Sequence, residues 1–118
     1  ENPGTMIYAD VITCAAPNKG AAMKFSGVTE QENLEVLSSR CKFVLDIAEA
    51  NNVDTLILGA YGCGEFRQNP YEVATIFCNL LKSGFYSFKY VIFAIPTTGH
   101  SRENYDVFNN IIGGIYGK

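Results

Sequence analysis

The sequence TLILGAYGCGEF, at positions 55–66, indicates both the fold class and the place of a functional site. Its first four residues form a largely apolar run, which is typical of a strand buried in a parallel sheet. Gly59, Gly62 and Gly64 follow, and glycines permit tight turns and the close approach of a ligand to the backbone. Because ligands of open α/β sheets bind beyond the carboxyl ends of the strands, we predict a strand over 55–58 that leads into a binding loop.

A helix is predicted on each side of this segment. Upstream, Thr29 and Glu32 have the spacing of a capping box, and the helix that they open ends at Asn51-Asn52. Downstream, Asn69 caps a second helix with a proline at its first position, and Gly84 ends it. The upstream helix has one apolar face that is expected to pack on a sheet, formed by Leu34, Leu37, Cys41, Val44, Leu45 and Ala48.

Two further strands and a last helix complete the predicted order. Residues 10–16 are predicted to form a short buried strand, and residues 19–28 a loop, because glycine and alanine occur there without a clear period. Residues 89–95 form the third strand, and Ser101 caps the last helix. The order βαβαβα implies a parallel sheet with right-handed crossovers, covered by helices. We therefore predict a single α/β domain over 1–118 with a three-layer α/β/α architecture.

Charge and composition exclude several classes of partner. The 118 residues carry nine Lys plus Arg and twelve Asp plus Glu, for a formal net charge of -3, and no basic stripe appears. Direct binding to DNA is therefore not expected, because it relies on neutralising phosphates with basic side chains. No apolar run is long enough to cross a bilayer, so no membrane association is expected.

The four cysteines do not suggest a metal site. Cys14, Cys41, Cys63 and Cys78 match no zinc spacing, and the expected state is reduced, buried thiols in a cytoplasmic protein with no metal and no cofactor. An alternative is a cysteine hydrolase in which Cys63 is the nucleophile and His100 the base, with Glu65 or Glu103 to orient the histidine. The glycine spacing around Cys63 differs from that of a nucleophile elbow, which makes this the least favoured hypothesis.

The loop after the central strand can bind an anion without basic side chains. Several consecutive backbone N–H groups could converge on one anion, helped by the N-terminus of the helix that begins near Asn69. The loop is neither a complete dinucleotide fingerprint, because Arg67 occupies the place of the last glycine, nor a P-loop. From the residues alone, an anion-binding loop and a plain structural turn both remain open.

The segment LGAYGCGEFR, at 58–67, followed by Asn69-Pro70, resembles the hallmark loop of the microbial-type poly(ADP-ribose) glycohydrolases. Upstream, VITCAAPN at 11–18 is similar to a strand of that family. Downstream, VIFAI at 91–95 and NYDVF at 104–108 are similar to its last strand and last helix. The resemblance covers nearly the whole chain in the right order, and the loop is its most specific part.

The resemblance implies a macrodomain-like fold and hydrolysis of the ribose–ribose bonds of poly(ADP-ribose). It implies that backbone N–H groups of 59–64 wrap the diphosphate of ADP-ribose, that Phe66 packs against the terminal ribose, and that Ile95 and Thr97 border the adenosine. The loop residues that it assigns to the ligand are Gly59, Ala60, Tyr61, Gly62, Cys63, Gly64, Glu65 and Phe66. Glu65 departs from the family, which places an apolar residue there.

A second departure concerns catalysis. The family's triple-glycine loop and glutamine-glutamate-glutamate motif lie upstream of the strand at Val11, so the chain is expected to be the C-terminal half of the family's domain with no catalytic residue of its own. We expect this chain alone to be inactive, and the alternative function is a non-catalytic module that binds ADP-ribose. The unpaired sheet edge of a half-domain implies self-association, or cover by the missing N-terminal half.

Overall fold

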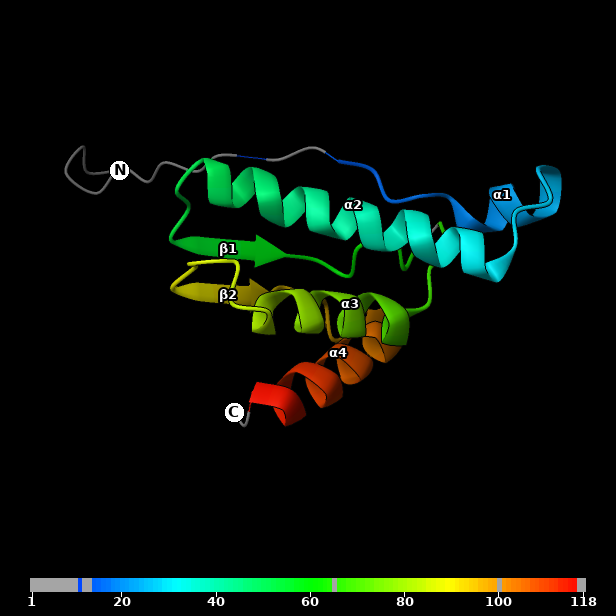
Figure 1. The fold of residues 1–118 in the computed structure, drawn as a ribbon. Coiled ribbons are helices and arrows are strands. Elements are labelled where there is room, and N and C mark those ends of the chain that lie inside the picture. The colour runs from blue at the N-terminus through cyan, green and yellow to red at the C-terminus, as the bar shows by residue number, and fades with distance from the viewer. Residues whose placement is uncertain (1–10, 12–13, 65, 100, 117–118) are drawn as a thin grey trace, which may run out of the picture.

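The chain has a mixed α/β fold with helices and strands in the order ααβαβα. The computed structural model describes residues 11, 14–64, 66–99 and 101–116 (Figure 1). Its elements are α1 (Lys19–Phe25), α2 (Glu30–Ala50), β1 (Thr55–Leu58), α3 (Pro70–Lys82), β2 (Tyr90–Phe93) and α4 (Ser101–Tyr116).

The predicted parallel pairing is confirmed for the two strands of the described residues. β1 and β2 are parallel, with Leu56 opposite Val91 and Leu58 opposite Phe93, and α3 makes the connection between them (Figure 1). The backbone ladder continues one step beyond the strands, since the N–H of Ala94 donates to the carbonyl of Leu58 at 2.7 Å. Both strands therefore end on the same side of the sheet, where the glycine loop begins.

The boundaries of α2 and α3 follow the predicted caps, whereas Ser101, predicted to cap the last helix, is the first residue of α4. The hydroxyl of Thr29 accepts from the N–H of Glu32 at 3.1 Å, and the Glu32 carboxylate accepts from the N–H of Thr29 at 2.9 Å. At the start of α3, the Asn69 side chain accepts from the N–H of Tyr71 at 2.8 Å. This helix ends at Lys82, shortly before Gly84, which has a φ of 87°. Reciprocal caps of this kind satisfy N–H groups that have no partner within the helix.

One core joins the helices to one face of the sheet. Helix α2 packs against α3, and α3 packs against α4. Leu56 and Leu58 of β1 are buried in this core, whereas Ile57, on the other face, is 65% exposed and its partner Ile92 is 49% exposed. The apolar run of β1 predicted cover on both faces. Within the described residues only one face of the sheet is covered. The helical layer that the predicted α/β/α architecture places on the other face does not appear among them.

The predicted βαβαβα order is wrong at its start. Asp10, Ile12 and Thr13 of the predicted strand 10–16 lie outside the described residues, and residues 14–16 form no strand. A strand needs a neighbour for its backbone ladder, and the sheet of the described residues consists of β1 and β2.

The predicted loop 19–28 is also wrong, because residues 19–25 form helix α1. Asn18 caps this helix, and its side-chain oxygen accepts from the N–H of Ala21 at 3.0 Å. Gly20 weakens a helix on propensity alone, but here it lets the side chain of Arg67 approach: a Cβ on Gly20 would lie 3.3 Å from the Arg67 Cδ. Tertiary packing, and not local period, decides this segment.

Candidate functional site

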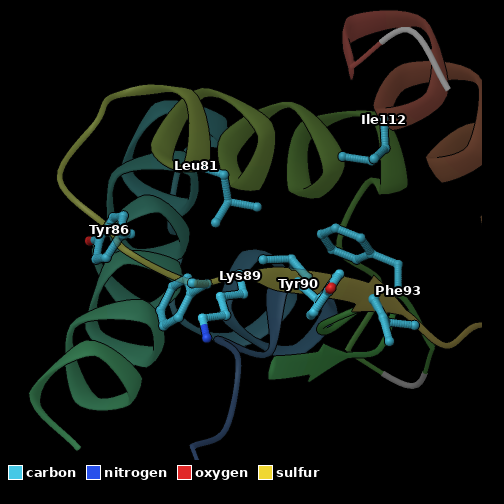
Figure 2. Close-up of a pocket in the computed structure, with 9 residues that line it drawn as sticks. Leu81, Tyr86, Lys89, Tyr90, Phe93 and Ile112 are labelled. Atoms are coloured by element: carbon cyan, nitrogen blue, oxygen red, sulfur yellow. The ribbon is translucent and has the colours of Figure 1, made fainter. Parts of the chain in front are cut away.

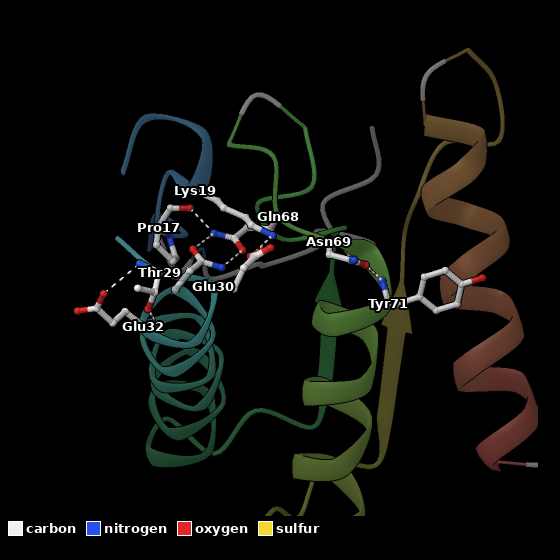
Figure 3. A network of polar contacts seen from close by, with 9 residues as sticks. Pro17, Lys19, Thr29, Glu30, Glu32, Gln68, Asn69 and Tyr71 are labelled. Atoms are coloured by element: carbon white, nitrogen blue, oxygen red, sulfur yellow. Dashed lines mark hydrogen bonds and ion pairs between the residues drawn. The ribbon is translucent and has the colours of Figure 1, made fainter. Parts of the chain in front are cut away.

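The glycine loop connects β1 to α3 and lies at the carboxyl end of the sheet. The N-terminal ends of α3 and α4 lie at this same end of the molecule (Figure 3). A shallow hollow of about 600 Å³ opens between these helix ends and is lined by Tyr71, Gly99, Arg102, Glu103, Asp106 and Val107. The structure thus brings the loop and the beginnings of two helices to one end of the fold.

Hydrogen bonds within the loop fold it into consecutive turns. The N–H of Cys63 donates to the carbonyl of Ala60 at 3.0 Å, and the N–H of Arg67 donates to the carbonyl of Gly64 at 3.0 Å. Gly62 is the third residue of the first turn, and its φ of 74° lies in the left-handed region. A Cβ at Gly62 would lie 2.7 Å from the Cβ of Ala16, so the position lacks space as well as favourable backbone geometry for any other residue.

Most backbone donors of the loop have no acceptor within the described residues. These donors are the N–H groups of Gly59, Ala60, Tyr61, Gly62 and Gly64, whereas that of Cys63 is used by the turn. Gly59 and Gly64 are exposed, and a Cβ at either would meet no atom within 4 Å. At Gly59 and Gly64 the loop therefore presents backbone donors next to open space, as an anion site requires.

The underside of the loop consists of neutral, partly buried side chains. The Tyr61 hydroxyl lies 3.4 Å from the sulfur of Cys14, and the Tyr61 ring meets Phe77 edge-on, with ring centroids 6.2 Å apart. Burial, together with the contact to Cys14, raises the pKa of Tyr61 above its usual value. The Tyr61 side chain is thus uncharged and packs the loop against the core.

The environment of Cys63 argues against the cysteine hydrolase hypothesis. Burial raises the pKa of the Cys63 thiol to about 12, and the thiol, not the reactive thiolate, is the form present near neutral pH. Two of the residues assigned to that hypothesis, His100 and Glu65, lie outside the described residues, and Glu103 is exposed.

The remaining residues assigned to the ligand lie around the loop. Phe66 is half-buried, and its carbonyl accepts from the N–H of Lys19 at 2.9 Å, which ties the end of the loop to α1. Ile95 packs against the same core as Ala60 and Tyr61. Thr97 is exposed.

Sequence reasoning missed a buried amide pair beside the loop. Asn33 and Gln68 are 3% and 2% exposed, and each side-chain amide donates to the other's oxygen, at 2.9 and 3.0 Å. Gln68 also donates to the carbonyl of Pro17 at 2.7 Å (Figure 3). A signal for Asn33 was present, because it lies one turn before Leu37 on the apolar face of α2. Nothing in the sequence marks Gln68.

A second hollow lies along strand β2, toward the opposite end of the sheet. It measures about 370 Å³ and is mainly apolar (Figure 2). Leu81 of α3 and Ile112 of α4 face the strand across it (Figure 2). Its other lining residues are Tyr86, Phe88, Lys89, Tyr90, Val91, Ile92 and Phe93. It is separate from the glycine loop.

The described part of the chain offers neither a cluster of metal ligands nor a membrane-spanning helix. No group of three or more His, Cys, Asp or Glu residues there could hold a metal ion. None of its helices combines the length and the apolar character needed to cross a membrane.

Comparison with solved structures identifies similar folds. Poly(ADP-ribose) glycohydrolase from Deinococcus radiodurans, crystallised in complex with ADP-ribose, matches with a TM-score of 0.78 and 31% identity, over 85% of this chain and 41% of that chain. The apo form of that enzyme matches with a TM-score of 0.76. The enzyme from Thermomonospora curvata matches with a TM-score of 0.72 and 33% identity, over 81% of this chain and 35% of that chain.

Neither a protein-family model nor a curated protein matches the sequence. The resemblance inferred from the loop and its flanking strands is nevertheless confirmed by the structural match to bacterial poly(ADP-ribose) glycohydrolases. The chain spans about two fifths of the length of the Deinococcus enzyme, so the match concerns a part of that fold.

The geometry at Gly62 predicts a loss of stability on substitution. Gly62→Ala introduces a left-handed non-glycine residue and a Cβ that overlaps Ala16, so the free energy of unfolding should fall by about 2 kcal/mol or more. Urea denaturation measures the change. Gly64→Ala is the matched control, because its Cβ meets no atom within 4 Å, and its free energy should stay within about 0.5 kcal/mol of the original. Equal stability of the two variants would contradict the described loop.

Proposed function

We propose, from the structural match to the two bacterial poly(ADP-ribose) glycohydrolases, that this chain is the ADP-ribose-binding part of a protein of that type. The parent protein would hydrolyse the ribose–ribose glycosidic bonds of poly(ADP-ribose). The observation that carries the proposal is the set of loop N–H groups at the carboxyl end of β1 that have no acceptor among the described residues. The Deinococcus enzyme that shares this fold was crystallised with ADP-ribose.

The diphosphate of ADP-ribose fits the chemistry of the loop. The chain has a net charge of -3, so a general electrostatic attraction for anions is absent. Backbone N–H groups provide positive partial charge only where they converge, and the N-terminus of α3 adds its dipole at the same end. In this proposal the N–H groups of Gly59 to Gly62 and of Gly64 bind the diphosphate, while Cys63 contributes its backbone only through the turn.

The remaining contacts are assigned by the same resemblance. Phe66 would pack against the terminal ribose, and Ile95 and Thr97 would border the adenosine. Glu65 lies outside the described residues, and a carboxylate beside the diphosphate would repel it. Support for this placement is that Ile95 packs on the same core as Tyr61, so both flank one end of the sheet.

We propose further that this chain alone binds ADP-ribose without cleaving the polymer. Glycoside hydrolysis needs a carboxylic acid that protonates the leaving oxygen. By the resemblance, that acid belongs to a triple-glycine and glutamine-glutamate-glutamate segment, and the 118 residues contain no such sequence. Loss of general acid catalysis lowers a rate by roughly 10² to 10⁴.

The full architecture of the proposed parent is a three-layer α/β/α macrodomain. The bare face of the sheet supports this, because Ile57, Tyr90 and Ile92 expose apolar surface that a parallel sheet normally buries. The apolar hollow along β2 adds to that surface at the strand's edge (Figure 2). In the proposed parent an N-terminal half covers this surface, and in the isolated chain a second copy does.

Binding of ADP-ribose tests the main proposal. Isothermal titration calorimetry should show one site on the 118-residue chain. Gly64→Ala should weaken binding by about tenfold, or about 1.4 kcal/mol, because a methyl group would occupy space that the loop leaves open to a ligand. Adenosine, which lacks the diphosphate, serves as the control ligand and should be insensitive to this substitution. Absence of ADP-ribose binding by the unaltered chain would refute the proposed function.

A hydrolysis assay tests the second part of the proposal. The chain is incubated with poly(ADP-ribose), and released ADP-ribose is quantified by chromatography. We expect no release above the level without protein, because the chain lacks the general acid. Robust turnover would show that the catalytic group lies within these 118 residues, and would therefore refute the proposed division between binding and catalysis.

Light scattering tests the cover of the bare sheet face. The isolated chain should self-associate as its concentration rises, and Ile57→Lys should shift it toward the monomer, because a charge would then have to be buried in the contact. Phe43→Lys is the matched control: Phe43 is exposed on α2, away from the sheet, and the change should leave association unaltered. A stable monomer at high concentration would contradict self-association.

A further inference from the structure

Asn33 and Gln68 are the buried polar side chains of the core in the part of the chain that the structure describes. They are 35 residues apart in sequence, and they satisfy one another through two reciprocal amide hydrogen bonds. An apolar pair would fill the same space without the cost of desolvating two amides. A polar pair at this place therefore calls for a reason other than burial.

The position of Gln68 supplies that reason. Its backbone N–H donates to the carbonyl of Gly62 at 2.8 Å and so closes the glycine loop. Its side chain binds Asn33 in the first turn of α2. It also donates to the carbonyl of Pro17 before α1 (Figure 3). One residue thus connects the loop to two other segments of the chain, and its Cγ lies 2.8 Å from where a Cβ on Gly62 would be.

The neighbours of Gln68 are anchored as well. The carbonyl of Phe66 accepts from the N–H groups of Lys19 and Gly20, at 2.9 and 3.4 Å. Arg67 has a φ of 61°, and its aliphatic stem lies against Gly20. Residues 66–68 are therefore anchored by contacts with α1, with α2 and with the loop itself. At the other end of the loop, the N–H groups of Gly59 to Gly62 have no acceptor among the described residues.

We infer that the Asn33–Gln68 amide pair positions the loop and holds its N–H groups, which have no acceptor among the described residues, in the arrangement that a diphosphate requires. This inference rests on the proposed function. A donor array that is ordered before binding saves the ligand the cost of ordering it, and the benefit appears as affinity. Both side chains are buried and bonded to the protein, so both are proposed as positioning residues and not as ligand contacts.

The first test compares a substitution of Gln68 with the same substitution at an exposed glutamine. Gln68→Glu removes the donor to Asn33 and Pro17 while conserving shape. Gln31→Glu, on the exposed side of the same first turn of α2, makes the same change of charge. Each variant of the 118-residue chain is titrated with ADP-ribose, and backbone hydrogen exchange is followed by NMR at Gln68 and, as a measure of the α3 core, at Phe77.

The positioning role predicts a specific pattern. Gln68→Glu should weaken ADP-ribose binding by at least about tenfold and speed exchange of the residue 68 amide, with exchange at Phe77 little changed. Gln31→Glu should match the original chain in both measurements. Unchanged affinity in Gln68→Glu despite faster loop exchange would overturn the inference, and so would unchanged loop exchange.

A second variant covers the case in which Gln68→Glu fails to fold. The double substitution Asn33→Leu/Gln68→Met replaces both hydrogen-bonding partners by apolar side chains of similar volume, which can be nearly neutral or stabilising. If the pair serves only to fill the core, this folded variant keeps its affinity for ADP-ribose, and the inference is overturned. If the pair positions the loop, affinity falls at least about tenfold while the melting temperature is maintained.

The hydrogen exchange measurement needs no ligand. If the unaltered chain fails to bind ADP-ribose, the proposed function fails, but faster exchange at residue 68 in the variants still supports the pair as the element that fixes the loop. If the chain binds and the variants bind equally well, the function stands and the positioning role fails.

Discussion

The hydrogen bond from the Gln68 N–H to the Gly62 carbonyl, 2.8 Å long, closes the loop on which the candidate site depends. It brings the main chain after the loop against a glycine that no other residue can replace without strain. Through its side chain, the same glutamine reaches α2 and the segment before α1. The order of the loop is thus a tertiary property, maintained by segments that adjoin it in space and not in sequence.

Much of the fold could be predicted from the sequence where the signal is local. Asn69 and Pro70 marked the start of α3, Thr29 and Glu32 that of α2, and the apolar run of β1 marked a strand. These features work through neighbours within one turn or along one strand, so the sequence alone carries them. Helix α1 and the absence of a strand over 14–16 depend on distant contacts, and there the prediction was wrong.

The candidate site divides in the same way. The glycines of the loop indicated an anion cradle because backbone freedom is a property of each glycine. The hydrogen bond from the Cys63 N–H within a turn could not be predicted. The spacing of the three glycines alone does not determine which backbone N–H of the loop donates to a carbonyl of the same loop. The Asn33–Gln68 pair was hidden for a stronger reason. Asparagine and glutamine are mostly surface residues. The place of Asn33 on the apolar face of α2 is a signal for its burial, but only the fold shows that Gln68 is buried against it.

The described residues therefore combine a well-ordered loop at the carboxyl end of the strands with an exposed apolar face of the sheet. At the carboxyl end of the strands, the loop N–H groups other than that of Cys63 have no acceptor among the described residues. On the bare face of the sheet, the apolar side chains of Ile57 and Ile92 are exposed, and no helix of the described residues covers them. Donors beside open space suit a small anion, whereas apolar area suits another piece of protein. If the chain is the ligand-binding part of a larger enzyme, as proposed, both the loop N–H groups and the exposed apolar face are explained.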